Sequence, residues 1–133
     1  MIALQPIART AHVATAWLLA ASVVVQAFLA GSALINLGGN GDFSAHVDFG
    51  YTVIGLITLA VLITALVARL DRRQVGLSFA LLVLYVVQTA LPNFKADVPS
   101  LAALHPANAM LLFVLAIFVA RRAMRPAAAD AVR

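Results

Sequence analysis

Four apolar stretches, each about as long as a membrane-spanning helix, constrain the fold of this chain most strongly. They cover about residues 11–37, 44–70, 75–91 and 100–122, with short polar segments between them. A helix needs roughly 20 apolar residues to cross a bilayer, and short connections make successive helices antiparallel. With 64% hydrophobic and 11% charged residues, 133 residues carry too much apolar surface for a water-soluble domain. We predict one all-α membrane domain, a four-helix transmembrane bundle, with a frayed tail at 126–133.

The basic residues predict an orientation. Lys95 precedes the fourth stretch, whereas the other basic residues all fall at the opposite ends of the stretches: Arg9, Arg69, Arg72, Arg73, Arg121, Arg122, Arg125 and Arg133. Because Lys and Arg are enriched on the cytoplasmic side, we expect a protein of the bacterial cytoplasmic membrane with both termini cytoplasmic. The net charge of +4 then reflects topology and not nucleic-acid binding. The first stretch exceeds the roughly 7–15 apolar residues of a signal peptide, so we interpret it as a membrane helix.

An internal repeat divides the chain into two hairpins. VVVQAFL at 23–29 and YVVQTAL at 85–91 place Gln26 and Gln88 62 residues apart. Each glutamine helix is followed by an outer loop and by a helix that opens with a histidine, His46 or His105, which are 59 residues apart. Two hairpins related by a pseudo-twofold axis along the membrane normal would place these histidines on opposite sides of that axis.

The histidine pair is the candidate functional site, because ionisable groups within membrane helices are usually functional. Haem needs two axial nitrogens and an apolar surrounding, so we predict haem b with His46 and His105 as iron ligands. Gly50 and Ala109 lie four residues further on, on the same helix faces, and would leave room for the porphyrin. The chain has no cysteine, which excludes iron–sulfur clusters, thiolate catalysis and covalent haem attachment.

Four further residues are candidates for the same site. Gln26 and Gln88 either hydrogen-bond between helices or contact the ligand and support an axial histidine. Asn108 is placed to hydrogen-bond a haem propionate or a loop. Lys95, as the outer basic residue, is the candidate partner for a propionate.

Two further features leave alternatives open. His12 has no histidine counterpart in the repeat, and we interpret it as an interfacial residue. Because His105 precedes Pro106, and proline disfavours helical geometry in the residue before it, the fourth helix either starts at Pro106 or starts at Ser100 and kinks.

Other interpretations of the histidine pair remain. Both side chains could lie at the lipid–water interface without a ligand. A zinc or copper site would need more ligands, for which Asp42 and Asp48 are the candidates. The chain could also be a structural subunit or a membrane protein that binds a small molecule or lipid without haem. It contains no nucleophile–base pair, phosphate loop or dinucleotide motif, so the pattern favours a non-enzymatic role.

The residues around both histidines resemble a known pattern. HVDFGYTVIGL, from His46, and HPANAMLLFVLAIFVARR, from His105, are similar to the openings of helices 2 and 4 in one four-helix half of the haem A synthase family. This resemblance implies haem binding. The synthases have two such halves, a loop cysteine pair and a glutamate three residues before the histidine, where this chain has Phe43. The whole chain also resembles a family of small uncharacterised bacterial four-helix membrane proteins, which implies no activity.

Together these features predict a haem protein that acts in electron transfer or in haem carriage or sensing. A single haem near one face cannot easily carry electrons across the membrane, so we expect a quinone or a redox protein as a partner. Two copies would rebuild an eight-helix arrangement, so we also expect self-association in the lipid bilayer.

Overall fold

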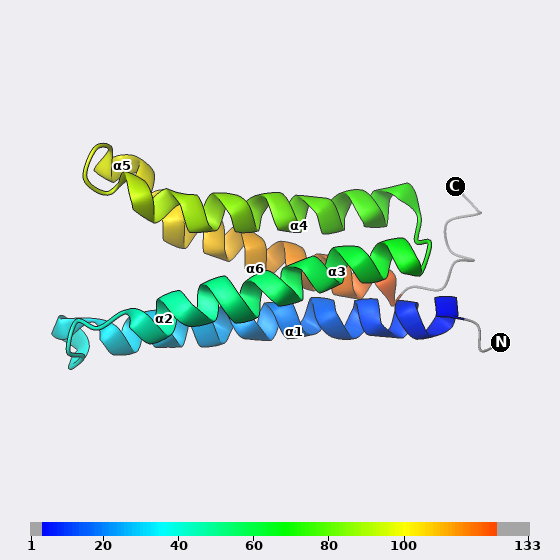
Figure 1. The fold of residues 1–133 in the computed structure, drawn as a ribbon, viewed down its shortest axis with the longest axis horizontal. Coiled ribbons are helices and arrows are strands. Elements are labelled where there is room, and N and C mark those ends of the chain that lie inside the picture. Colours follow the sequence, from blue (N-terminus) through cyan, green and yellow to red (C-terminus); the bar gives the residue numbers. More distant parts are fainter. Residues whose placement is uncertain (1–3, 125–133) are drawn as a thin grey trace.

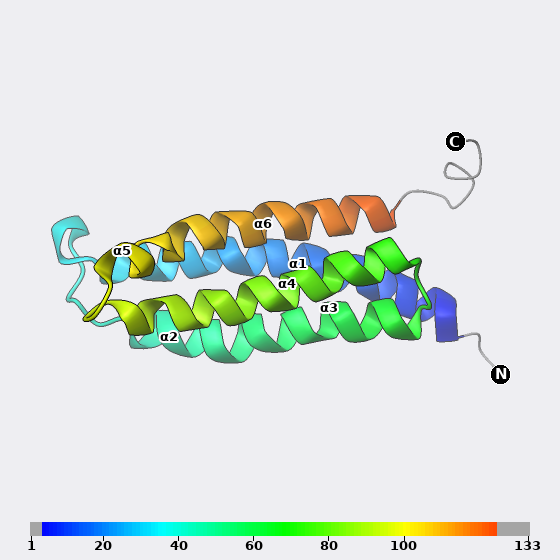
Figure 2. The same cartoon turned by 90° about the horizontal axis from the view of Figure 1, so that it is seen from above.

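The computed structural model describes residues 4–124, which form a bundle of four long helical segments (Figures 1 and 2). Neighbours along the chain run antiparallel, and these residues contain no strand. The elements are α1 (Leu4–Ala33), η1 (Ile35–Leu37), α2 (Ser44–Phe49), η2 (Gly50–Ile54), α3 (Gly55–Val67), α4 (Arg72–Ala90), η3 (Leu91–Phe94), α5 (Pro99–Ala102) and α6 (Leu104–Ala123).

The predicted four-helix membrane bundle is confirmed. Four segments are long and apolar enough to span a membrane: Leu4–Ala33, Ser44–Val67, Arg72–Phe94 and Pro99–Ala123. The side chains on the outside of the bundle are largely apolar, with Phe28 71% and Met110 70% exposed. Exposed apolar surface of this extent is expected where lipid is the solvent. The protein is therefore a membrane protein.

The helix ends differ from the predicted ones for local reasons. The first helix already includes Leu4, the first described residue, and does not start near residue 11. Pro6 is tolerated near this end because its missing N–H costs little in the first turns of a helix. The third begins at Arg72, because the Asp71 side chain caps it and accepts a hydrogen bond from the Gln74 backbone N–H at 3.0 Å. The predicted tail at 126–133 lies outside the described residues.

The fourth span begins at Pro99 and is interrupted once, at Ala103. Pro106 has no N–H to donate to the carbonyl four residues earlier, at Ala102, and its ring crowds that carbonyl. The helix therefore breaks just before α6, which contains both His105 and Pro106. Of the two alternatives, a start near Ser100 with an interruption close to Pro106 is the one the structure adopts.

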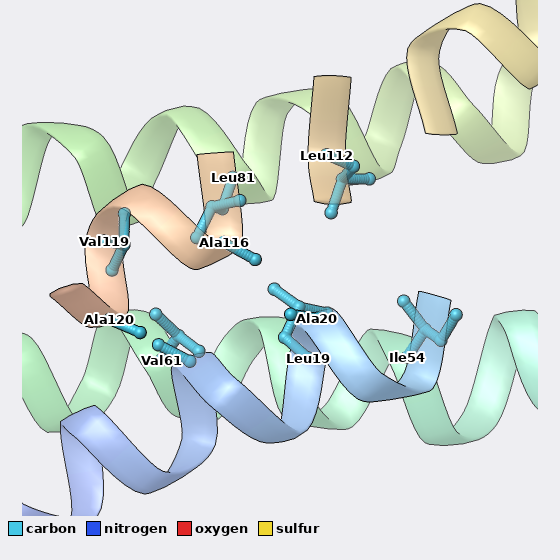
Figure 3. Close-up of a cluster of buried hydrophobic side chains, with 10 residues drawn as sticks. Leu19, Ala20, Ile54, Val61, Leu81, Leu112, Ala116, Val119 and Ala120 are labelled. Carbon is cyan, nitrogen blue, oxygen red and sulfur yellow. The ribbon is translucent and has the colours of Figure 1, made fainter. Parts of the chain in front are cut away.

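The helices follow the order α1, α3, α4 and α6 around the bundle. Helix α1 packs against α3 and α6, and α4 packs against the same two helices, so α1 lies diagonally opposite α4 and α3 diagonally opposite α6. These diagonals join the corresponding helices of the two hairpins. Figure 3 shows the core between them, where Leu19 and its counterpart Leu81 are both fully buried. The arrangement fits a pseudo-twofold axis along the bundle.

The two hairpins differ by one residue, and the π-helical turn η2 at Gly50–Ile54 accounts for it. A π turn inserts one residue into a helix. Before this turn, corresponding residues of the two hairpins are 59 positions apart in the sequence, as His46 and His105 are. After it, corresponding buried residues are 58 positions apart. The pairs are Ile54 and Leu112, Thr58 and Ala116, Val61 and Val119, and Ala65 and Ala123. The π turn therefore restores the symmetry of the core below the histidines.

One end of the bundle carries the arginines. Arg9 near the start of α1 donates to the backbone carbonyl of Ala123 at the end of α6, at 3.3 Å. Arg122 pairs with Asp71 in the α3–α4 turn at 3.1 Å. The start of α1 and the end of α6 therefore lie at the same end of the bundle, opposite the end that carries α5 (Figure 1).

Candidate functional site: a pocket with two histidines

A pocket of about 540 Å³ lies at the end of the bundle opposite the arginines. Its volume falls within the roughly 300–1,000 Å³ of small-molecule sites. His46 on α2 and His105 on α6 enter it from diagonally opposite helices, with ring centroids 6.2 Å apart and ring planes at 67°. Seven of the eight candidate residues line this pocket: Gln26, His46, Gly50, Gln88, Lys95, His105 and Ala109.

The first histidine is oriented by Gln26 of α1. His46 Nδ1 lies 3.1 Å from the backbone carbonyl of Gln26. Because a carbonyl only accepts, Nδ1 carries the hydrogen and Nε2 keeps its lone pair. The Gln26 side-chain amide donates to the His46 backbone carbonyl at 2.8 Å and lies 3.4 Å from His46 Nε2. Gln26 Oε1 is buried and has no hydrogen-bond partner within residues 4–124.

The second histidine repeats this arrangement with one addition. His105 Nδ1 donates to the Gln88 backbone carbonyl at 2.9 Å, and the Gln88 side-chain amide donates to His105 Nε2 at 3.1 Å. Asn108 donates to Gln88 Oε1 at 2.7 Å and to the Leu84 backbone carbonyl at 2.9 Å. Asn108 is 7% exposed, and its hydrogen bond fixes the orientation of the Gln88 side-chain amide. The sequence suggested a propionate or a loop as its partner, but the structure directs its amide to α4.

Gly50 has a second reason to lack a side chain. A Cβ placed there would lie 2.7 Å from Gln26 Nε2, closer than Cβ atoms approach other heavy atoms, so the amide would have to shift. The amide of Gln26 can therefore cross to the His46 carbonyl only because residue 50 is glycine. Its counterpart Ala109 lines the pocket with a Cβ of its own.

Several residues that the sequence analysis did not single out complete the pocket. Phe43 packs edge-on against His46, with ring centroids 6.2 Å apart. The Tyr85 hydroxyl donates to the Tyr51 carbonyl at 3.2 Å, within the π turn, where the regular hydrogen-bond pattern is interrupted. A Cβ at Gly55 would lie 2.5 Å from that hydroxyl. No sequence pattern predicts the Tyr85 hydrogen bond, because it depends on the π turn.

His12 is not interfacial, so that interpretation was wrong. Its side chain is 0% exposed and lies in the core near the arginine end. His12 Nδ1 donates to the Val61 carbonyl at 3.0 Å, and the Gln74 side chain donates to His12 Nε2 and to the Val119 carbonyl, each at 2.9 Å. Gln74 follows His12 by 62 residues, the same offset as Gln26 and Gln88. Applying the repeat offset to His12 would have identified its partner.

The alternative of a simple metal site finds no support in the described part of the chain. Residues 4–124 contain no group of three or more His, Cys, Asp or Glu side chains that could hold a metal ion. Asp42, one suggested ligand, accepts from the Ser44 backbone N–H at 2.8 Å in the loop between η1 and α2. Hydrogen bonds from the Ser44 backbone and side chain lower the pKa of this carboxyl.

Fold and site together define a four-helix membrane protein with paired histidines in a pocket at one end. The chain belongs to a family of unknown function, DUF6220, whose model matches residues 26–94, just over half of its length. The matched segment includes Gln26, His46 and Gln88 and ends before His105. No curated protein and no solved structure matches the chain. The resemblance to the haem A synthase family therefore stays a prediction.

Proposed function

We propose that this protein binds one b-type haem between His46 and His105 and acts in electron transfer or in haem carriage or sensing. One observation carries the proposal. Both imidazoles line one pocket and donate Nδ1–H to a backbone carbonyl, so each Nε2 carries a lone pair, which only a glutamine amide approaches. Two acceptors cannot hydrogen-bond to each other, but they can share a metal ion. A backbone carbonyl behind a histidine is also the usual support of a metal ligand.

The spacing of the rings fits this donor set. A metal ion bound at about 2.0–2.1 Å by each of two opposed imidazoles would leave the ring centroids about 6 Å apart, and the observed separation is 6.2 Å. Haem iron takes only two ligands from the protein, whereas zinc sites usually take three or four. The pair of histidines, without a third ligand in residues 4–124, favours haem over a bare ion.

The remaining residues have roles that follow from their places. Haem would supply one-electron chemistry. Gln26 and Gln88 fix the tautomer and direction of the two imidazoles through their backbone carbonyls. Lys95 is the lining residue with a positive charge. It would pair with a carboxylate of an amphipathic ligand whose apolar part lies deeper in the pocket.

The arginine distribution supports an outer location for the pocket. Six described arginines lie at the opposite end, Arg9, Arg69, Arg72, Arg73, Arg121 and Arg122, and we assign that end to the cytoplasm of a bacterial cell. One haem near one face of the membrane cannot carry electrons across the whole bilayer. A quinone or a redox protein is therefore the proposed partner. Self-association into an eight-helix assembly belongs to the same proposal.

The test is the absorption spectrum of protein purified in detergent from haem-replete cells. We expect a Soret band with the low-spin features of two histidine ligands, and we expect His46→Ala and His105→Ala each to lose those features. Phe28→Ala is the control, since Phe28 is 71% exposed and lies outside the pocket. A folded, colourless protein that takes up no added haem would contradict the proposal. That result would favour a structural subunit or a protein that binds a small molecule or lipid in this pocket.

A further inference from the structure

The two histidines are held differently, and the difference comes from one position in the repeat. Three residues after His105 the chain has Asn108, whereas three residues after His46 it has Phe49. Asn108 hydrogen-bonds to Gln88 Oε1 and to the Leu84 carbonyl. Phe49 has no polar atom in its side chain and packs against the apolar core. Only the second half therefore has an amide that fixes its glutamine.

This asymmetry reaches the imidazole nitrogens. The Gln88 amide donates to His105 Nε2 at 3.1 Å while Asn108 holds its oxygen, so the His105 lone pair is already engaged. The Gln26 amide makes its shorter bond, 2.8 Å, to the His46 carbonyl and lies 3.4 Å from His46 Nε2. A hydrogen bond of the longer kind is weak. The His46 lone pair is therefore the more available of the two.

We propose that Gln88 and Asn108 form a latch on His105, which makes His46 the permanent iron ligand and His105 the exchangeable one. The latch competes with iron for His105 Nε2, so the His105 side of the pocket accepts a small neutral ligand such as a diatomic gas. This inference rests on the proposed haem function. Gln88 and Asn108 are positioning residues here, because they act through His105.

The haem-free protein provides the first test. In the wild type, ¹⁵N NMR of the imidazoles should show both histidines as Nδ1–H tautomers, with a hydrogen-bonded Nε2 in His105 and a freer Nε2 in His46. Gln88→Leu should shift the His105 Nε2 signal toward that of a free lone pair, since the Gln88 backbone carbonyl is retained. The matched variant Gln26→Leu should change the His46 signal less. Equal signals for both histidines in the wild type would overturn the latch.

The haem-loaded protein provides the second test, with carbon monoxide as the probe. His46→Ala should lose haem, whereas His105→Ala should retain a five-coordinate haem that binds carbon monoxide. Gln88→Leu should lower the carbon monoxide affinity about twofold to tenfold, since a hydrogen bond of ordinary strength no longer opposes the binding of His105 to iron. Asn108→Leu should change it in the same direction, and Gln26→Leu should change it less. Phe28→Ala, at a position that is 71% exposed and outside the pocket, should leave it unchanged.

The outcomes separate the latch from the haem proposal. Equal effects of Gln26→Leu and Gln88→Leu, or a rise in carbon monoxide affinity with Gln88→Leu, would overturn the latch and leave haem binding standing. Circular dichroism of each variant establishes that the bundle is folded. If no variant and no wild-type sample binds haem, both proposals fail.

Discussion

The two ends of this bundle use the same hydrogen-bonding unit for opposite results. At the end that carries the arginines, named the inner end after the proposed orientation, His12 and Gln74 meet across the axis and close the core, with both side chains no more than 2% exposed. At the outer end, His46 and His105 meet across the same axis and leave a pocket of about 540 Å³. In both places Nδ1 donates to a backbone carbonyl and a glutamine amide lies near Nε2.

The same symmetry has opposite consequences for the polar groups at the two ends of the bundle. At the inner end the two residues related by the axis are His12 and Gln74. The Gln74 amide donates to His12 Nε2, so the two side chains satisfy each other. At the outer end they are two imidazoles with identical tautomers, so neither can donate to the other. The inner pair therefore stabilises the fold. The two outer Nε2 acceptors, which face glutamine amides and not each other's donors, are suited to a third partner between them.

The largest effect is expected from His12→Ala. The substitution leaves a cavity and removes the acceptor of the Gln74 amide, so we expect a loss of about 3 kcal/mol in the free energy of unfolding. Unfolding in mixed detergent micelles measures it. Phe28→Ala, at a position 71% exposed, is the control and should cost much less. If His12→Ala were as mild as this control, the inner cluster would not be a structural unit.

Gln74→His would convert the inner end into a copy of the outer one. Two imidazoles would then meet in a closed core, and the Val119 carbonyl would lose its donor. We expect a destabilisation of about 2 kcal/mol from lost hydrogen bonds and overpacking, measured by the same unfolding method. No haem band should be gained. A new metal or haem site in this variant would show that the pocket is less important than the histidine pair.

Gly50→Ala tests the outer end, because the added Cβ would lie 2.7 Å from Gln26 Nε2. The amide must leave the His46 carbonyl, so we expect a loss of about 1–2 kcal/mol in unfolding free energy. The matched variant Gly76→Ala adds the same methyl group within a helix, where nothing lies within 4 Å of the added Cβ. A thermal melt that ranked Gly76→Ala as the more damaging change would contradict the role of Gly50.

The smallest effect is expected from Asp71→Ala, outside both clusters. Asp71 caps α4 and pairs with Arg122, so we expect a loss of about 1 kcal/mol. Burial alone would raise the pKa of Asp71, but the hydrogen bonds from Gln74 and Arg122 outweigh it and lower that pKa. This stabilisation is present above the ordinary pKa of about 4 and fades as the pH falls below it. Unfolding measured from pH 6 to pH 3 should show the decline in the wild type and not in Asp71→Ala.

Much of the outer site was predictable, because its residues recur at fixed offsets. The glutamines, the histidines and the small residues four positions later lie in a repeated pattern, and the structure brings them to one pocket. Asn108 was singled out, but its partner was not predictable, because α4 must pack beside α6 before Gln88 comes within reach. The burial of His12 was not predicted, because its counterpart in the repeat, Gln74, is a glutamine and not a histidine.

The sequence by itself determined four membrane-spanning helices, their antiparallel order and the division into two hairpins, since hydropathy and repeat spacing are local properties of the chain. Only the tertiary structure decided which helices are diagonal, that one hairpin contains a π turn and that His12 is buried against Gln74. The physical reason is that these features depend on how polar groups from distant segments find partners. In lipid, that pairing is settled between helices and not within them.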